Sequence, residues 1–165
     1  MPTKPASNGQ QINPFETRWI RPIALDYISS ENQYVSRLLD LVLSSDKPMQ
    51  IVGMHGIGKT TLAFSLCREA IHRGTEAQHF RCGRQPFHEI RKSIETPAKL
   101  TVLDEYEQFS MWNKFRSRRM AARSPGKVLV ITHQNQGFPT LVHLKPNPEA
   151  MKSVVKRLQL KHDYG

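Results

Sequence analysis

Cysteine is scarce in this sequence, and long apolar runs are missing. Only Cys67 and Cys82 occur, and their flanks lack the paired spacings of zinc ribbons and redox motifs. We therefore expect reduced thiols, no disulfide and a cytoplasmic location. No apolar run approaches the roughly 20 residues that cross a bilayer, so we expect no membrane association. Residues 1–14 lack the apolar centre of a secretory signal and are rich in Asn, Gln and Pro, which favours a disordered arm.

Acidic residues are also in short supply, and the deficit is confined to one part of the chain. The sequence has 24 Lys and Arg against 14 Asp and Glu, for a net charge of +10. Residues 1–50 hold five of each sign, so the remaining 115 residues carry 19 basic and 9 acidic groups. An excess of one sign attracts partners of the other, and an anionic partner is therefore favoured beyond residue 50.

One domain is expected from the length and the apolar content. A chain of 165 residues buries roughly two-thirds of the surface that it exposes when unfolded. With 38% hydrophobic residues, the chain can build a sizeable core. We place this domain at 15–165, after the arm.

The hydrophobic pattern alternates between strand-like and helix-like segments. Strands are expected at 49–53, 77–82, 99–103, 127–132 and 140–144. Helices are expected at 60–71, 86–94, 107–123 and 148–160, with a first helix that starts near Tyr34 and ends between Ser44 and Pro48. This alternation favours an α/β fold in which helices cover both faces of a mostly parallel five-stranded sheet.

A glycine-rich motif follows the first expected strand. The run Gly53-Met54-His55-Gly56-Ile57-Gly58-Lys59-Thr60 matches the Walker A pattern G-x-x-x-x-G-K-[ST] at every fixed position, and Thr61 follows it. The motif stands between a predicted strand and a predicted helix, which is the context that it requires. We take residues 53–61 as the candidate nucleotide-binding residues.

The residue types in this motif suit a triphosphate. Glycines allow backbone amides to converge on phosphate oxygens without a Cβ in the way, and the helix N-terminus adds its positive end. Lys59 is expected to reach the β- and γ-phosphates, and it is a candidate catalytic residue. The Thr60 hydroxyl is a candidate ligand for Mg²⁺, a cation that prefers oxygen donors.

A second acidic motif ends the third expected strand. Leu100-Thr101-Val102-Leu103-Asp104-Glu105 is an apolar run that closes on two carboxylates, as a Walker B segment does. Asp104 is the second candidate Mg²⁺ ligand. Glu105 is placed to orient or deprotonate an attacking water in phosphoryl transfer.

Both motifs together resemble the additional-strand catalytic-glutamate group of P-loop ATPases, and most nearly an AAA+-like core, over about residues 21–144. This resemblance implies a three-layer P-loop NTPase fold, with ATP and Mg²⁺ as cofactors. The run Gly56-Ile57-Gly58-Lys59-Thr60-Thr61-Leu62-Ala63 is also similar to the loop of NB-ARC signalling ATPases. Their multidomain form is far longer than this chain.

The resemblance assigns roles to two further segments. Arg21-Pro22 followed by Leu25-Asp26 is similar to the AAA+ segment that lines the adenine pocket, which implies ATP over GTP. Thr132 and His133 end the strand whose counterpart carries a side chain that senses the γ-phosphate, so both are candidate catalytic residues. His133 also resembles the switch histidine of ABC transporter ATPases, although no LSGGQ-like signature occurs.

The chain departs from the AAA+ pattern after its last expected strand. Residues 145–165 are too few for the helical lid that supplies a second sensor in AAA+ proteins. Closure over the nucleotide would then require another subunit, as in a homo-oligomer, or a partner protein. We expect slow turnover by the isolated monomer.

The helix expected after the acidic motif is strongly basic. It carries Lys114, Arg116, Arg118, Arg119 and Arg123, interleaved with Trp112 and Phe115. These cations are candidates for gripping nucleic acid phosphates, and one arginine is a candidate finger on a neighbouring subunit's ATP. A solvated basic face is the simpler alternative.

Three functions remain open from the sequence. The leading hypothesis is an ATPase whose cycle switches its binding to another macromolecule, with nucleic acid first among these. A small-molecule or nucleoside kinase shares the glycine-rich motif, whereas the Asp104-Glu105 pair favours water as the acceptor. The third is a nucleotide-dependent interaction module with little hydrolysis.

Overall fold

The computed structural model describes Tyr27, residues 34–146, and residues 148 and 152. The arm expected at 1–14 and the Arg21-Asp26 segment lie outside the described residues, as does most of the helix expected at 148–160.

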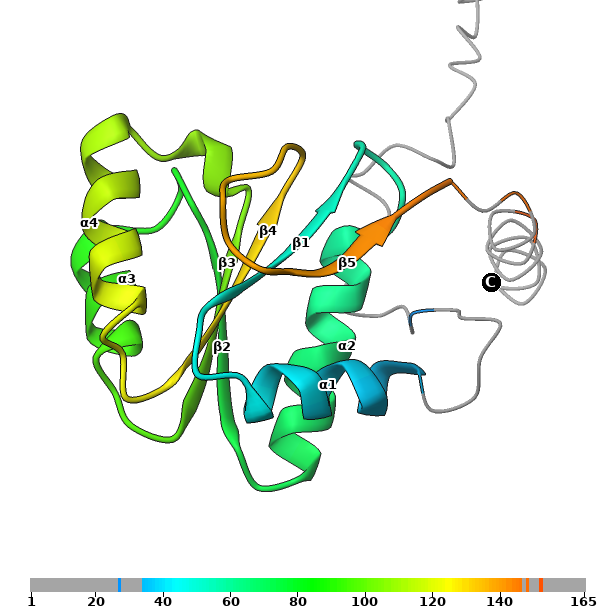
Figure 1. The fold of residues 1–165 in the computed structure, drawn as a ribbon, viewed down its shortest axis with the longest axis horizontal. Coiled ribbons are helices and arrows are strands. Elements are labelled where there is room, and N and C mark those ends of the chain that lie inside the picture. Colours follow the sequence, from blue (N-terminus) through cyan, green and yellow to red (C-terminus); the bar gives the residue numbers. More distant parts are fainter. Residues whose placement is uncertain (1–26, 28–33, 147, 149–151, 153–165) are drawn as a thin grey trace, which may run out of the picture.

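Strands and helices alternate along the described chain (Figure 1). The helical elements are α1 (Tyr34–Ser44), α2 (Lys59–His72), α3 (Phe87–Ile94), the 3₁₀ helix η2 (Tyr106–Gln108) and α4 (Met111–Ala121). The strands are β1 (Met49–Gly53), β2 (Glu76–Arg81), β3 (Lys99–Asp104), β4 (Lys127–Thr132) and β5 (Thr140–Leu144). None of these helices has the length and apolar character of a bilayer span.

The five strands form one sheet in the order β2-β3-β4-β1-β5. Every pairing between neighbours is parallel, so the sheet expected to be mostly parallel is parallel throughout. Parallel strands need crossover connections, and helices supply those between β1 and β4, over both faces, whereas a loop leads from β4 to β5. The carboxyl ends of all strands therefore lie along one edge of the sheet.

Helices cover the two faces and create two hydrophobic clusters. In Figure 1, α1 and α2 lie on one side of the sheet, and α3 and α4 lie on the other. The side chains of β4 alternate between the two clusters. Leu129 and Ile131 pack toward α1 and α2, whereas Val128 and Val130 pack toward α3 and α4. A strand whose side chains are buried on both faces reads as a continuous apolar run, which is why 127–132 predicted it. The three-layer α/β architecture is thus confirmed.

The helix expected at 107–123 is shorter than predicted and begins later. Glu105 adopts a left-handed conformation (φ 54°, ψ 42°), and a single 3₁₀ turn follows it. The chain then restarts as α4, where the Ser110 side chain caps the helix by accepting a hydrogen bond from the Asn113 amide at 3.2 Å. A serine N-cap is a strong start signal, and it fixes the beginning of α4 at Met111.

Cys67 and Cys82 are free and buried. Cys67 belongs to the cluster under α1 and α2, and Cys82 belongs to the cluster under α3 and α4. Burial raises the pKa of the Cys67 thiol to about 12, so this group is uncharged at neutral pH.

Candidate functional site

The glycine-rich loop, residues 53–60, leaves the carboxyl end of β1 and turns into α2. Gly56 (φ 76°) and Gly58 (φ 92°) have left-handed backbones, which a side chain would strain. Gly58 is the N-cap of α2 and has no side chain to bond the first N–H groups of the helix. These donors are therefore available to an anion at this end of α2.

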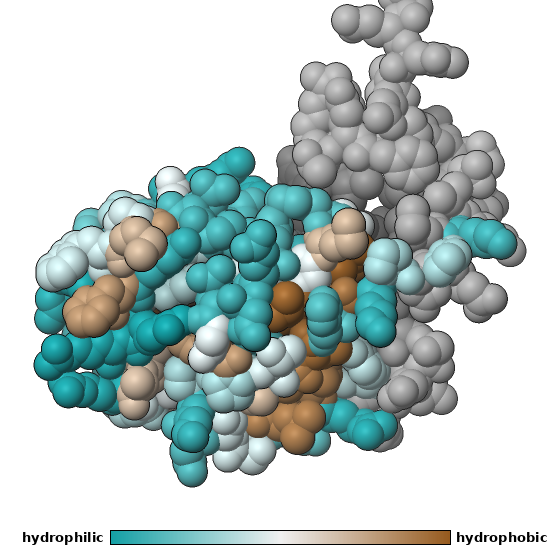
Figure 2. Space-filling model, turned by 45° about the horizontal axis from the view of Figure 1, so that its top comes forward, coloured by the Kyte–Doolittle hydropathy of each residue, from teal (hydrophilic) through white to brown (hydrophobic). Residues whose placement is uncertain are grey.

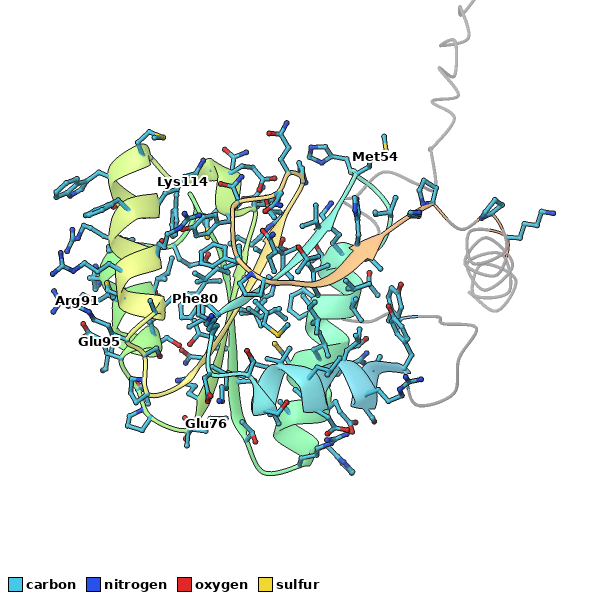
Figure 3. The ribbon with its side chains drawn as sticks, in the orientation of Figure 1. Met54, Glu76, Phe80, Arg91, Glu95 and Lys114 are labelled. Carbon is cyan, nitrogen blue, oxygen red and sulfur yellow. The ribbon has the colours of Figure 1, made fainter. Side chains whose placement is uncertain are left out.

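Lys59 is folded back onto the loop. Its Nζ donates to the carbonyl oxygens of Gly53 at 2.7 Å and Met54 at 2.6 Å. Burial lowers the pKa of this lysine, while the negative charges of Glu107 and Asp104 act in the opposite direction. The Met54 side chain itself is exposed at the tip of the loop, so it contributes its backbone here (Figure 3).

Asp104 ends β3 and faces the first turn of α2. Its Oδ2 accepts a hydrogen bond from the Thr60 hydroxyl at 2.8 Å and lies 3.2 Å from Nε2 of His79. Burial acts to raise the pKa of this carboxyl, but the hydrogen bonds from His79 and Thr60 hold it below its usual value. A hydroxyl and an ionised carboxylate that converge on one point are the hard oxygen donors that Mg²⁺ prefers, so this pair fits the metal.

Glu105 turns away from Thr60 and toward β2. Its Oε1 accepts a hydrogen bond from Nη2 of Arg81 at 2.6 Å. Arg81 ends β2 and is in register with Asp104 on the neighbouring strand, which places its guanidinium beside the acidic motif. The left-handed backbone of Glu105 sends the two adjacent carboxylates in different directions.

A third carboxylate, Glu107, reaches the glycine-rich loop from η2. Both of its oxygens are buried, and within the described part of the chain neither accepts a hydrogen bond. Oε1 nevertheless lies 3.0 Å from Nε2 of His133, so the pair is in electrostatic contact without hydrogen-bond alignment. Glu107 therefore lies next to Lys59 and His133 without a hydrogen bond from the described residues.

His133 follows the end of β4 and contacts the glycine-rich loop. Its ring packs edge-on against His55, with centroids 3.3 Å apart. Burial lowers the pKa of His133, the charge of Glu107 opposes that shift, and Lys59 and His55 add to it. His133 is thus biased toward the neutral form at neutral pH.

Thr132, the other candidate at this strand end, is buried and engaged locally. Its hydroxyl donates to the carbonyl of Gln134 at 3.0 Å and accepts from the Gln134 amide at 3.4 Å. The hydroxyl thus stabilises the turn after β4. His133 is the side chain of this pair that contacts the loop.

The structure brings most of the predicted site together and adds three residues. Lys59, Thr60, Asp104 and His133 converge at the carboxyl edge of the sheet, with Gly53 to Thr61 around them. His79, Arg81 and Glu107 were not among the predicted site residues. A signal for them existed, because polar residues at the carboxyl ends of neighbouring parallel strands meet at one edge.

The basic residues on and after α4 do not form one uniform surface. The guanidinium of Arg116 lies 5.0 Å from the Phe87 ring centroid, and that of Arg118 lies 4.8 Å from the Phe138 ring centroid. Arg118 also donates to the carbonyl oxygen of Gln136. Both arginines thus pack on aromatic rings, although Arg118, like Arg119, is exposed.

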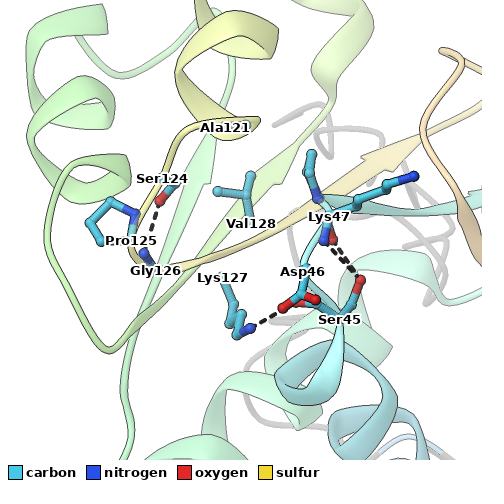
Figure 4. A pocket seen from close by; sticks show the side chains of 10 residues that line it. Ser45, Asp46, Lys47, Ala121, Ser124, Pro125, Gly126, Lys127 and Val128 are labelled. Atoms are coloured by element: carbon cyan, nitrogen blue, oxygen red, sulfur yellow. Dashed lines mark hydrogen bonds between the residues drawn. The ribbon is translucent and has the colours of Figure 1, made fainter.

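A small polar pocket of 190 Å³ lies at the opposite edge of the sheet, where β1 and β4 begin (Figure 4). Nζ of Lys127 donates to the Ser45 carbonyl at 2.7 Å across it. The glycine-rich loop follows the other end of β1, so this pocket is remote from the convergent residues described above.

No protein-family model matches the chain, and no curated protein matches its sequence. Solved structures do match the fold. A DNA replication initiation factor aligns with a TM-score of 0.62 at 17% identity, over 85% of this chain and 54% of its own. The replication initiator DnaA bound to AMPPCP and single-stranded DNA aligns with a TM-score of 0.61 at 17% identity, over 82% and 53%.

The RuvB Holliday junction branch migration motor of Thermotoga maritima aligns with a TM-score of 0.58 at 15% identity, over 87% of this chain and 56% of its own. The chain thus spans about half the length of each of these structures. At such low identity the likeness concerns the backbone alone. The chain has the AAA+-like P-loop NTPase fold that its glycine-rich and acidic motifs predicted.

Proposed function

We propose that this protein binds ATP with Mg²⁺ at residues 53–61 and hydrolyses it to ADP and phosphate. The observation that carries the proposal is the 2.8 Å contact between the Thr60 hydroxyl and the Asp104 carboxylate, beside the folded-back Lys59. Thr60 in the first turn of α2 and Asp104 at the end of β3 are 44 residues apart in sequence. Their convergence on the exposed amides of a helix N-terminus is the geometry that a metal-bound triphosphate requires.

Lys59 has a defined task in this proposal. Its ammonium group exchanges the carbonyls of Gly53 and Met54 for β- and γ-phosphate oxygens, which form stronger charge-assisted hydrogen bonds. Thr60 and Asp104 hold Mg²⁺, which when bound neutralises charge that develops on the phosphoryl oxygens.

The residues that act on the attacking water come from β3, η2 and the end of β4. Glu105 orients the water once its contact with Arg81 is broken. His133, which lies against His55 of the loop, senses the γ-phosphate through a ring nitrogen. Glu107 positions His133 through the 3.0 Å contact between Oε1 and Nε2. Thr132, also a candidate for sensing the γ-phosphate, would act by keeping the turn after β4 in place.

A nucleic acid is the partner that we propose for the cycle. The net charge of +10 lies beyond residue 50, and the structural neighbours include a replication initiator bound to single-stranded DNA and a Holliday junction motor. Further copies of the chain or a partner protein are the other partners that we propose. We place this activity in the cytoplasm, where the free thiols of Cys67 and Cys82 remain reduced.

A second function is favoured by one contact. Arg81 holds Glu105 at 2.6 Å, so a chain in which this pair persists would bind ATP and hydrolyse it slowly. It would then be a nucleotide-dependent interaction module.

Calorimetry and phosphate release test these proposals together. Wild-type protein should bind ATP in the presence of Mg²⁺, Lys59→Ala should lose most of this affinity, and Glu105→Gln should keep the affinity but lose phosphate release. ATP binding without release under any condition, including added nucleic acid, would favour the interaction module. Transfer of phosphate only to an added small acceptor would favour a kinase. Absence of binding by folded wild-type protein would refute the site itself.

A further inference from the structure

The solvent face of α4 carries exposed aromatic and apolar side chains. Met111, Trp112 and Phe115 are 83%, 66% and 58% exposed. Positions three and four apart share one face of a helix, so these residues lie opposite the buried Ser117 and Ala121. On the α3 and α4 side of the molecule, Figure 2 shows apolar side chains surrounded by hydrophilic ones. This face therefore presents flat apolar groups within a polar surface.

Trp112 and Phe115 form a stacked pair on this face. Their ring centroids are 6.0 Å apart and the ring planes are inclined by 26°. Arg119 lies on the same stripe, four residues after Phe115, and is exposed. The helix contains four cations and no acidic residue between Met111 and Ala121. The two aromatic rings thus lie on a helix whose charged residues are all positive.

We propose that this α4 face binds single-stranded nucleic acid, with bases that stack on Trp112 and Phe115 and a phosphate that pairs with Arg119. The proposal rests on the proposed function in that it specifies its nucleic acid partner. Every base has a π-face, and an unpaired strand can offer it to an exposed ring. In a duplex these faces are occupied by neighbouring bases, and only edges and phosphates remain accessible.

Charge selects this partner over an apolar protein surface. A hydrophobic protein patch on Trp112 and Phe115 would have to cover or displace the solvent around Arg119 without neutralising it, which is costly. A polyanion with flat apolar groups satisfies both features together. Arg116 and Arg118 already contact the Phe87 and Phe138 rings, so we assign the phosphate to Arg119.

The inner side of α4, opposite this face, is hydrogen-bonded to the acidic segment of the candidate site. Tyr106 stands between Glu105 and Glu107 in the sequence, and its side chain is buried. Its hydroxyl donates a hydrogen bond to the Lys114 carbonyl at 3.1 Å. The same hydroxyl lies 2.9 Å from Oγ of Ser117. A strand bound to α4 would therefore contact the helix that holds Tyr106, the residue between the two glutamates.

The test measures binding of a fluorescently labelled oligo-dT strand by anisotropy, with the full chain and without nucleotide. The double variant Trp112→Ala/Phe115→Ala should weaken binding at least tenfold, since base–aromatic stacking contributes about 1–3 kcal/mol per base. Ile71→Ala is the matched control, because Ile71 is 58% exposed on α2, far along the sequence from α4. It should bind as wild type does.

Salt dependence separates stacking from charge. The aromatic double variant should keep the wild-type slope of log affinity against log salt, whereas Arg119→Ala should reduce its magnitude by about 0.7. In a Trp19→Phe background, emission from Trp112 should be quenched by oligo-dT and unchanged by an abasic strand of equal length. Trp112→Phe retains an aromatic ring and should keep most of the affinity.

Three results would overturn the inference: equal binding of abasic and oligo-dT strands, tighter binding of duplex than of single strands, or unchanged affinity in the aromatic double variant. Each of these measurements is made without nucleotide, so its outcome does not depend on the ATP site. If wild-type protein binds ATP but not oligo-dT, only the proposed role of the α4 face is refuted. Retained oligo-dT binding without ATP binding refutes only the proposed ATPase site.

Discussion

Replacing Glu107 with glutamine is expected to stabilise the fold and to slow ATP hydrolysis. The carboxylate is buried with no hydrogen bond to either oxygen, and 3.0 Å separates it from Nε2 of His133. Glutamine keeps the shape of the side chain and removes its charge. Because a buried carboxylate without hydrogen bonds opposes folding and the same group positions His133, one change should move stability and activity in opposite directions.

The magnitude of the stability effect follows from burial. An unsatisfied buried polar group costs about 1–3 kcal/mol, and more when it is charged. Glutamine would recover part of that cost, about 1 kcal/mol, which for a domain of this size raises Tm by about 2–4 °C. Loss of the contact that positions His133 should slow phosphate release about tenfold. This factor corresponds to about 1.4 kcal/mol.

Thermal unfolding and phosphate release measure the two effects, and histidine NMR supplies a third observable. The charge of Glu107 raises the pKa of His133, so this pKa should fall further in Glu107→Gln. Glu95→Gln is the matched control, because Glu95 forms an exposed pair with Arg91 at 3.0 Å, away from the loop (Figure 3). A lower Tm in Glu107→Gln, or an unchanged His133 titration, would refute the reasoning.

Three further predictions concern the site and the sheet. Arg81→Ala should release Glu105 and raise the basal rate of phosphate release severalfold, with the affinity for ATP unchanged in calorimetry. Gly126→Ala should destabilise the fold by about 1–3 kcal/mol in urea unfolding, because an added Cβ would lie 2.7 Å from the Lys99 carbonyl oxygen. The folded-state pKa of His133 lies below its ordinary value of 6.5, so the unfolded chain takes up this proton first. The free energy of unfolding should therefore decrease as pH falls below about 6.5, and His133→Asn should weaken this dependence in pH-resolved denaturation.

Local sequence signals were sufficient for the strands and insufficient for one helix. The bounds of β1, β4 and β5 match the expected ones, because glycine, proline and polar residues flank continuous apolar runs. The helix after β3 was expected to start at Glu107, and its true start at Met111 depends on the left-handed Glu105 and the Ser110 cap. Helical spacing alone does not reveal a backbone turn of this kind.

The candidate site was predictable as a set of motifs but not as a geometry. The glycine-rich loop and Asp104 meet as their spacing implied. The separation of Glu105 from Glu107 depends on one backbone conformation and on Arg81, which comes from another strand. Likewise, the contact of Arg118 with the Phe138 ring joins residues that are 20 positions apart along the chain. Long-range partners of this kind carry no local signal.

Several departures from ordinary protein chemistry lie at the carboxyl edge of the sheet, although Ala98 (φ 53°), before β3, also has a left-handed backbone. Glu105 has a left-handed backbone, the Glu107 carboxylate accepts no hydrogen bond from the described residues, and burial lowers the pKa of Lys59. Each feature costs stability, whereas the two hydrophobic clusters follow the regular alternation of a doubly covered sheet. A fold has no structural reason to collect such costs in one place, and a ligand that carries several negative charges and a divalent cation would relieve them. The distribution of strain thus supports the nucleotide site independently of the motif that first indicated it.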